Sequence, residues 1–185
     1  ARVYRDDSVV DIRSNSAAGA TLYIIDAGTT ARITVHPVPP GRADWLLPAS
    51  ELGPGHYRVQ MPDSRVVGRP ATEFWVLARD AVPVVEVSGS SFKAGESIHV
   101  AWRHAPGNRN DYLAAYGHGV ETNYDNGLAW VYTGALPDGE TRIDESTTAR
   151  GWPLEPGDYV IRLLKDDGYE VLAESALFTV EPGTP

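Results

Sequence analysis

A short turn that leads into a strand occurs twice in this chain, and it limits the folds that the sequence can adopt. The first copy is Pro54-Gly55-His56-Tyr57 and the second is Pro156-Gly157-Asp158-Tyr159. Proline holds φ at about −65°, and glycine adopts turn conformations that a residue with a Cβ resists. The tyrosine begins an alternation of apolar and polar residues, which is typical of a strand with one buried face. The two copies therefore predict two β-domains of the same kind.

In each copy the tyrosine hydroxyl can donate a hydrogen bond back to the turn that precedes it. This arrangement is the tyrosine corner of Greek-key β-sandwiches, in which two sheets pack face to face. Each copy also has a tryptophan shortly before the turn, Trp45 in the first and Trp152 in the second. We therefore place Tyr57 and Tyr159 in two separate cores and interpret both as structural residues.

Strands are predicted where apolar and polar residues alternate between stretches rich in Gly, Pro, Asn and Asp. Among the core residues we expect Ile33 and Val35, which should point inward, and Trp102. The fold class that follows is all-β, with two tandem Greek-key sandwiches of the immunoglobulin-like kind, residues 1–80 and residues 81–185. The expected strands are 8–13, 21–26, 32–36, 56–61, 72–78, 85–87, 97–103, 111–117, 128–133, 141–144, 159–165 and 169–180, with 1–7 a lead-in and 88–95 a loop.

The composition of the 185 residues is that of an ordinary globular protein, with 42% hydrophobic and 22% charged residues. The chain has no cysteine, which excludes disulfides, thiolate metal sites and cysteine nucleophiles. No apolar run approaches the ~18 residues that a membrane-spanning helix needs, so no membrane span is expected.

The net charge of the chain belongs entirely to its second part. Residues 1–80 carry nine basic and nine acidic side chains, whereas residues 81–185 carry seven basic and sixteen acidic ones, which accounts for the net charge of −9. Because phosphate binding needs clustered lysine and arginine, the acidic second domain excludes nucleic acid as an expected partner. A simple solvated surface is the alternative interpretation of the acidic residues.

Four short motifs of the second domain carry a resemblance to known accessory domains. They are Asp111-Tyr112 to Tyr116, Trp130-Val131-Tyr132-Thr133, Gly157-Asp158-Tyr159 and Asp167-Gly168-Tyr169. Over residues 84–181 the chain resembles the immunoglobulin-like and fibronectin III-like modules of secreted bacterial enzymes. More narrowly, it resembles a sandwich found beside calcineurin-like metallophosphoesterase and phosphodiesterase domains, and it is similar in pattern to the SKICH domain, a membrane- and partner-targeting sandwich. The resemblance implies an extracytoplasmic module whose catalytic domain is separate.

One polar loop, residues 121–127, is a candidate calcium site. Asn123, Asp125 and Asn126 offer hard oxygen ligands there, shortly before Gly127. Calcium takes six or more oxygens, and the loop lacks the closing glutamate of an EF-hand. Asn, Asp and Gly are also ordinary turn residues, so a plain loop is the alternative. The five histidines share no zinc-binding spacing, and no other cofactor is expected.

No catalytic motif is recognised in the sequence. Ser88-Gly89-Ser90-Ser91 is not a nucleophile elbow. Asp166 and Asp167 are adjacent, so their side chains diverge, and we interpret them as hairpin formers. We therefore expect no enzymatic activity from this chain; a small hydrolase with an unrecognised site is the least favoured alternative.

Three aromatic residues are candidate ligand contacts. Trp130 and Tyr132 lie two residues apart and therefore on one face of a strand, close to Tyr124 in the sequence. A flat row of aromatic rings stacks on sugars, so these residues predict a carbohydrate-binding module as one alternative. The other alternative is that they belong to the core, because aromatic side chains supply much of the buried area of a small sandwich.

The leading hypothesis is a non-catalytic accessory or interaction module of a secreted or surface bacterial protein, as the tandem immunoglobulin-like part of a larger phosphoesterase-type enzyme. Its expected partners are a catalytic domain or another protein, and a cell-surface polymer if the aromatic residues bind carbohydrate.

Overall fold

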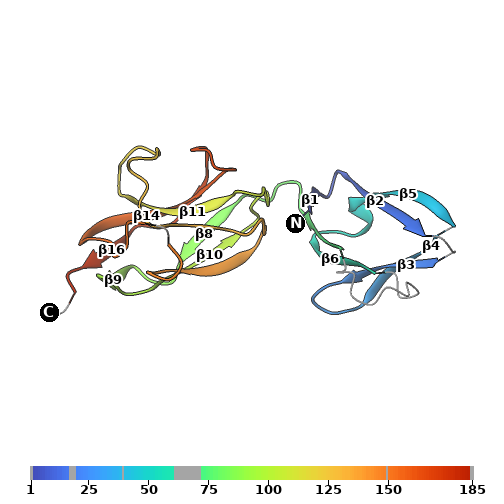
Figure 1. Cartoon of the computed structure of the whole chain (residues 1–185), viewed down its shortest axis with the longest axis horizontal. Helices are drawn as coiled ribbons and strands as arrows, with labels where there is room; N and C mark the ends of the chain where they lie inside the picture. The colour runs from blue at the N-terminus through green and yellow to red at the C-terminus, as the bar shows by residue number, and fades with distance from the viewer. Residues whose placement is uncertain (1, 17–19, 39, 61–71, 149, 184–185) are drawn as a thin grey trace. The chain divides into compact units, whose positions relative to one another are not determined.

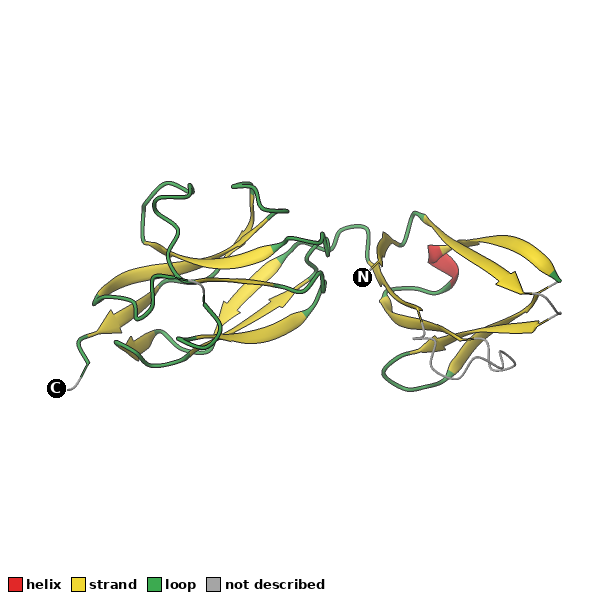
Figure 2. Ribbon diagram, viewed as in Figure 1, coloured by secondary structure: helices red, strands yellow, loops and turns green. Residues whose placement is uncertain are grey.

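The structure is a computed structural model that describes residues 2–16, 20–38, 40–60, 72–148 and 150–183. The chain divides into two compact units, Ala1–Ala81 and Val82–Pro185. Both consist of strands joined by loops, apart from one short 3-10 helix in the first unit (Figure 2). The fold class is therefore all-β.

The first unit is built from two sheets. One has the strand order β1-β7-β6-β3-β4 and the other consists of β2 and β5. Strand β1 runs parallel to β7, and the other pairs are antiparallel. The elements are β1 (Arg2–Arg5), β2 (Val9–Ser16), β3 (Ala20–Asp26), β4 (Arg32–Val38), β5 (Gly41–Pro48), the 3-10 helix (Ala49–Glu51), β6 (Gly55–Gln60) and β7 (Thr72–Leu77) (Figure 1).

The second unit also has two sheets, ordered β13-β10-β8 and β12-β11-β14-β16-β9, and β15 pairs with β14 beside the latter. The short strand β9 runs parallel to β16, and the other pairs are antiparallel. The strands are β8 (Val84–Val87), β9 (Ser91–Lys93), β10 (Ile98–Arg103), β11 (Tyr112–Gly117), β12 (Trp130–Tyr132), β13 (Gly139–Ile143), β14 (Gly157–Leu164), β15 (Val171–Glu174) and β16 (Phe178–Glu181).

The two units share one strand order. In the first, an early strand lies parallel to the last strand of the sheet, and the sheet continues β7-β6-β3-β4; in the second, the equivalent order is β9-β16-β14-β11-β12. The facing sheet pairs β2 with β5 in one unit and β10 with β13 in the other. Consecutive strands thus cross between sheets, as they do in an immunoglobulin-like Greek-key sandwich.

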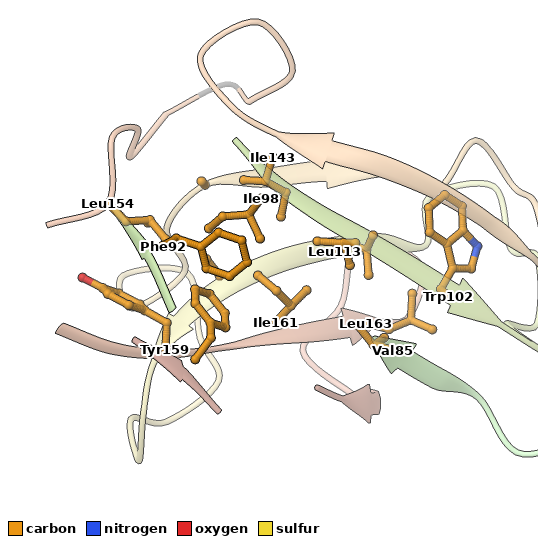
Figure 3. Close-up of a cluster of buried hydrophobic side chains, with 14 of the residues drawn as sticks. Val85, Phe92, Ile98, Trp102, Leu113, Ile143, Leu154, Tyr159, Ile161 and Leu163 are labelled. Atoms are coloured by element: carbon orange, nitrogen blue, oxygen red, sulfur yellow. The ribbon is translucent and has the colours of Figure 1, made fainter. Parts of the chain in front are cut away.

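The core of the second unit lies between its two sheets (Figure 3). Trp102 is 3% exposed and donates a hydrogen bond from Nε1 to Leu136 O at 2.9 Å. Gly139 lies directly opposite Trp102, and a Cβ at this position would lie 2.4 Å from the indole ring. The tryptophan therefore fills the space that a side chain at residue 139 would need.

Each unit has a buried tyrosine whose hydroxyl returns to the preceding turn. Tyr57 donates to Leu52 O at 2.6 Å, and Tyr159 donates to Glu155 O at 2.8 Å. Both rings stack on a core phenylalanine, Phe74 in the first unit and Phe178 in the second. Burial raises the pKa of both tyrosines.

The expected inward orientation of Ile33 and Val35 is wrong. In the register of β3 and β4, His36 lies opposite Leu22, which is buried, and Val35 lies opposite Tyr23. The core face of β4 therefore carries Thr34 and His36, and Ile33 and Val35 are exposed. The register of β4 with β3 sets this orientation, because a shift of one residue would move every side chain of the strand to the other face.

Three strands, β1, β5 and β9, lie outside the expected strands, and each pairs with a part of the chain that is distant in the sequence. β5 pairs with β2, whose residues lie between 25 and 39 positions earlier. β1 lies in the expected lead-in and pairs with β7, whose residues lie about 70 positions later. β9 lies in the expected loop 88–95 and pairs with β16. Their backbone hydrogen bonds come from tertiary pairing, which no local pattern indicates.

Candidate binding face of the second unit

The side chains on the outer face of the six-stranded sheet form a second apolar layer. Tyr112 of β11 lies opposite Tyr132 of β12, and Ala114 lies opposite Trp130. Alternation along β11 adds Tyr116 to this face. We call these four aromatic residues, Tyr112, Tyr116, Trp130 and Tyr132, the aromatic face. Tyr112, Tyr116 and Trp130 pack with the buried residues Ala114, Val160 and Leu164 in a cluster separate from the main core, and Tyr132 contacts the rings of Tyr112 and Trp130.

The rings of the aromatic face meet edge to face. The Trp130 and Tyr132 centroids are 5.0 Å apart with an interplanar angle of 77°. Tyr112 lies 6.2 Å from Trp130 and 6.3 Å from Tyr132, at 76° and 74°. Aromatic pairs prefer such T-shaped arrangements to face-to-face contact. The rings therefore hold one another in place but do not form the flat row that a carbohydrate platform needs.

A strained hairpin tip borders the aromatic face. Asp166 and Asp167, between β14 and β15, both have positive φ, 45° and 60°. Gly168 N closes the turn by donating to Lys165 O at 2.7 Å. Two consecutive residues with positive φ are the requirement of a type I′ hairpin turn, which matches the twist of the flanking strands. The turn predicted at these residues is present.

The neighbouring loop holds this tip in place. Asp111, which is fully buried, accepts hydrogen bonds from the backbone N–H of Asp166 at 3.1 Å and of Asn108 at 2.8 Å. Asn110 O accepts from the backbone of Asp167 at 3.1 Å. Positive φ at residues other than glycine persists only where surrounding contacts enforce it. These contacts therefore fix the conformation of the hairpin tip.

Two tyrosines of the aromatic face bond to this tip. Tyr132 donates to Asp167 Oδ1 at 2.8 Å, and Tyr112 donates to Gly168 O at 3.1 Å. The bond to Asp167 raises the pKa of Tyr132, and burial and the negative charge of the carboxylate act in the same direction. Burial is the main reason that the pKa of Tyr112 is also raised. Both phenols remain neutral donors at physiological pH.

Arg162 joins the loop 118–127 to the sheet. Its side chain is almost buried and lies on the outer face of β14, with the guanidinium 4.7 Å from the centre of the Tyr116 ring. It donates to Glu174 Oε2 at 2.7 Å, to Val120 O at 3.0 Å and to Thr122 Oγ1 at 2.9 Å. The loop (yellow to gold in Figure 1) is therefore anchored at its first half by one side chain.

Three tyrosines around this apolar layer remain exposed. Tyr132 is 45% exposed, Tyr169 46% and Tyr124 65%. Arg150 lies over the Tyr124 ring at 4.2 Å and donates to Tyr124 O at 2.6 Å. Of the three predicted ligand contacts, Trp130 and Tyr132 are in direct contact, whereas Tyr124 contacts Arg150 in the loop. Tyr169 and Asp167 are further candidates, which the hairpin pattern could have indicated.

Two of the three candidate calcium ligands, Asn123 and Asn126, make hydrogen bonds within their own loop. Asn123 Oδ1 accepts from the backbone N–H of Asn126 at 2.9 Å, and Asn126 Nδ2 donates to Glu121 O at 3.0 Å. Asp125 is exposed. Calcium binding at this loop stays a prediction. Over the described residues, no group of three or more His, Asp and Glu side chains is arranged to hold a metal ion.

An open depression lies over the other sheet, and it contains the type of residues that hydrolysis would need. Glu86, Ser88, His99 and Glu140 are among its lining residues. However, no side-chain hydrogen bond or ion pair joins His99 to a serine or carboxylate in this fully described region. A nucleophile needs a base within hydrogen-bond reach. The depression therefore does not present a nucleophile–base pair.

Comparison with protein-family models finds no match, and comparison with curated proteins finds none either. Among solved structures, the chain is similar to the human OSCAR ligand-binding domain, with 19% identity, a TM-score of 0.44, and 96% of this chain and 93% of that one covered. It is also similar to a biofilm associated protein BSP domain, at 18% identity and a TM-score of 0.37, covering 100% of this chain and 29% of that one. A third similar structure is the teleost fish polymeric Ig receptor ectodomain, at 11% identity and a TM-score of 0.32, with 99% and 95% covered.

These similarities are distant, and the fold class rests on the strand order described above. The more specific resemblance of the sequence to phosphoesterase accessory domains and to the SKICH domain stays a prediction. None of the helices in the described part of the chain is long and apolar enough to cross a membrane.

Proposed function

We propose that the chain is a non-catalytic interaction module and that the aromatic face of its second unit, together with Tyr169, binds a partner protein. The module belongs to a larger extracytoplasmic protein, and the sequence resemblance points to a phosphoesterase-type catalytic domain as the part it accompanies. The partner is either that catalytic domain or a separate protein.

The observation that carries the proposal is the apolar character of an outer sheet face. In an antiparallel sheet with one solvated face, the residues on that face are ordinarily polar. Here the outer face carries Tyr116, which is 1% exposed, and Trp130, which is half-buried. Around this layer Tyr132 and Tyr169 are exposed. Tyrosine and tryptophan in well-packed surroundings are enriched among the residues that dominate binding energy in protein interfaces.

The geometry supports the carbohydrate alternative less well. Sugar binding by a platform needs coplanar rings, whereas Trp130 and Tyr132 are inclined by 77°. Tyr124, the most exposed of the candidates, carries Arg150 over one face of its ring. A carbohydrate could stack on single rings, so a direct assay separates the two functions.

The test compares the wild-type chain with Tyr132→Ser and, as a matched control in the first unit, Tyr23→Ser. Proteins recovered from the source cells on each immobilised chain are quantified, and any protein lost with Tyr132→Ser alone is purified. We expect its Kd for the chain to weaken about 10-fold or more on Tyr132→Ser, which is the effect of truncating a central interface residue.

The same variants are incubated with insoluble cellulose, chitin and peptidoglycan. We expect these polymers to leave the concentration of the wild-type chain unchanged. If a polymer removes the wild-type chain from solution and Tyr132→Ser abolishes this removal, the aromatic face binds carbohydrate and the proposal of protein binding is wrong. If Tyr132→Ser changes neither protein recovery nor polymer binding, the aromatic face is not the interaction site.

A further inference from the structure

We propose that the aromatic face and the adjacent hairpin dock a protein segment that carries arginine or lysine side chains. This inference rests on the proposed function and adds the chemistry of the partner. The hairpin concerned runs from Lys165 to Glu170, with Asp166 and Asp167 at its tip.

The charges around the hairpin favour a basic partner. Asp166, Asp167 and Glu170 are exposed, and the buried Asp111 lies beneath the tip. The basic side chains in these segments are Lys165, which pairs with Glu170 at 2.8 Å, and the exposed Arg109 in the neighbouring loop. Three exposed carboxylates therefore lie beside two basic groups, with Asp111 buried beneath them, in a unit that carries the whole net charge of the chain. Such a surface attracts cations and repels acidic partners.

The turn itself does not require the two carboxylates. Asp166 Oδ1 accepts from Asn110 N at 3.3 Å, and Asp167 Oδ1 accepts from Tyr132 at 2.8 Å. An asparagine oxygen accepts the same bonds, and asparagine tolerates positive φ and is the preferred first residue of a type I′ turn. Two adjacent like charges, in contrast, repel each other. Because the backbone has no need of these charges, they are available for recognition.

The exposed rings complement the carboxylates. A guanidinium or ammonium group above the Tyr132 ring would meet the negative face of the ring and lie beside Asp167, and Tyr169 offers a second ring on the same hairpin. The unit already shows this contact twice: Arg150 lies over Tyr124 at 4.2 Å and Arg162 over Tyr116 at 4.7 Å.

The face is also pre-organised. Tyr132 is held by its bond to Asp167 and by the rings of Tyr112 and Trp130. Ordering a side chain on binding costs conformational entropy, so a ring that is already fixed improves affinity without new contacts. Rings fixed beside exposed carboxylates fit a cationic side chain better than an apolar or acidic one.

The experiment uses a synthetic peptide of three Gly-Ser-Arg repeats as the probe and the same peptide with Glu in place of Arg as its control. Each is titrated into the full chain labelled with nitrogen-15, at about 50 mM NaCl to limit screening. We expect the arginine peptide to shift the backbone amide signals of Asp167, Gly168 and Tyr169 and the indole signal of Trp130. The glutamate peptide should leave them unchanged.

Two variants with the same loss of charge give the decisive comparison. Asp167→Asn keeps the turn and the acceptor for Tyr132, and we expect it to weaken the apparent Kd about 2- to 5-fold, the range of an exposed ion pair. Glu140→Gln removes one exposed charge from the other sheet and should leave the Kd unchanged. Raising NaCl to about 300 mM should also weaken the wild-type complex.

The proposal is overturned if the peptide shifts no signal of the hairpin, if both peptides shift them equally, or if Asp167→Asn and Glu140→Gln weaken binding to the same extent. The last result would mean general attraction to an acidic domain. A different result contradicts the proposed function, namely that Tyr132→Ser changes neither protein recovery nor polymer binding. One result would separate the two proposals: a protein partner whose binding is lost with Tyr132→Ser but is unchanged by Asp167→Asn and by salt. That result would support the aromatic face as the interaction site and overturn only the proposal that the partner is basic.

Discussion

Tyr132 donates a 2.8 Å hydrogen bond to Asp167, although 35 residues separate the two in the chain. The bond joins β12, an edge strand, to the hairpin between β14 and β15. It therefore fixes the position of an exposed aromatic ring relative to an exposed carboxylate.

This bond predicts a change in stability at alkaline pH. Because the pKa of Tyr132 is raised in the folded protein, the folded state binds the phenolic proton more tightly than the unfolded state does. That stabilisation is present below the ordinary tyrosine pKa of about 10 and is lost as the pH rises through the folded value. We expect Tyr132→Phe to lose less stability than the wild type between about pH 9 and about pH 11 in urea denaturation. Equal losses in both proteins would contradict the prediction.

The hydrogen bonds of Arg162 predict that the loop 118–127 opens locally when this side chain is replaced. Arg162→Met keeps the apolar part of the side chain but removes the donors to Glu174, Val120 and Thr122. We expect a loss of about 1–3 kcal/mol in unfolding free energy, because the carbonyl of Val120 loses its charged partner. Hydrogen exchange of the loop amides should accelerate. Arg142→Met, at an exposed position of β13, is the control and should leave loop exchange unchanged.

The close packing of Gly139 against Trp102 predicts that even an alanine at position 139 destabilises the protein. In Gly139→Ala the new Cβ would lie 2.4 Å from Trp102 Cζ2, so the indole or the strand must move. Overpacking of this kind costs about 1–3 kcal/mol. The matched control is Gly89→Ala, whose Cβ would make an ordinary 3.4 Å contact with Phe92. Urea denaturation that ranks the two variants equally would show that Trp102 relocates freely.

The hydrogen bonds of the Tyr57 and Tyr159 hydroxyls predict that removing either hydroxyl lowers the unfolding free energy by a similar amount. Tyr159→Phe leaves Glu155 O without its donor, and Tyr57→Phe does the same to Leu52 O. We expect each variant to lose roughly 1–3 kcal/mol, the cost of an unsatisfied partner that is partly shielded from water. Tyr169→Phe, at an exposed position, should unfold like the wild type. Urea curves that superimpose for all four proteins would show that the returning bonds contribute no stability.

The loop 121–127 gives a test of the predicted calcium site. The loop offers three candidate side chains, and Asn123 Oδ1 already accepts a hydrogen bond from Asn126 N, so these side chains supply fewer oxygens than the six or more that calcium takes. We expect the melting temperature to be the same in millimolar calcium and in chelator. A rise in calcium that Asp125→Ala abolishes would establish the site, since a ligand that binds only the folded state stabilises it.

Much of the fold could be predicted from local chemistry. The alternation from 97 to 103 predicted β10, and the Asp166-Asp167-Gly168 turn predicted the hairpin between β14 and β15. The orientation of β4 could not be predicted in this way. Apolar Ile33 and Val35 face solvent because the pairing of β4 with β3 puts Thr34 and His36 on the core side, and this register is a property of the assembled sheet.

The candidate site was predicted only in part. The spacing of Trp130 and Tyr132 places them on one face, but the contacts of Tyr112 and Tyr116 with them depend on the register of β11, β12 and β14. The bond from Tyr132 to Asp167 depends on the same register and on the buried Asp111 that supports the hairpin tip.

The sequence by itself determined where most of the strands and turns form, because proline, glycine, aspartate and alternating side chains act on the few residues around them. Only the tertiary structure decided which strands are neighbours and which faces are covered. The short strands β1 and β9 obtain their hydrogen bonds from strands roughly 70 to 90 positions away. The aromatic face likewise forms only when β11, β12 and β14 lie side by side, since side chains from separate segments must come within contact distance before they exclude water.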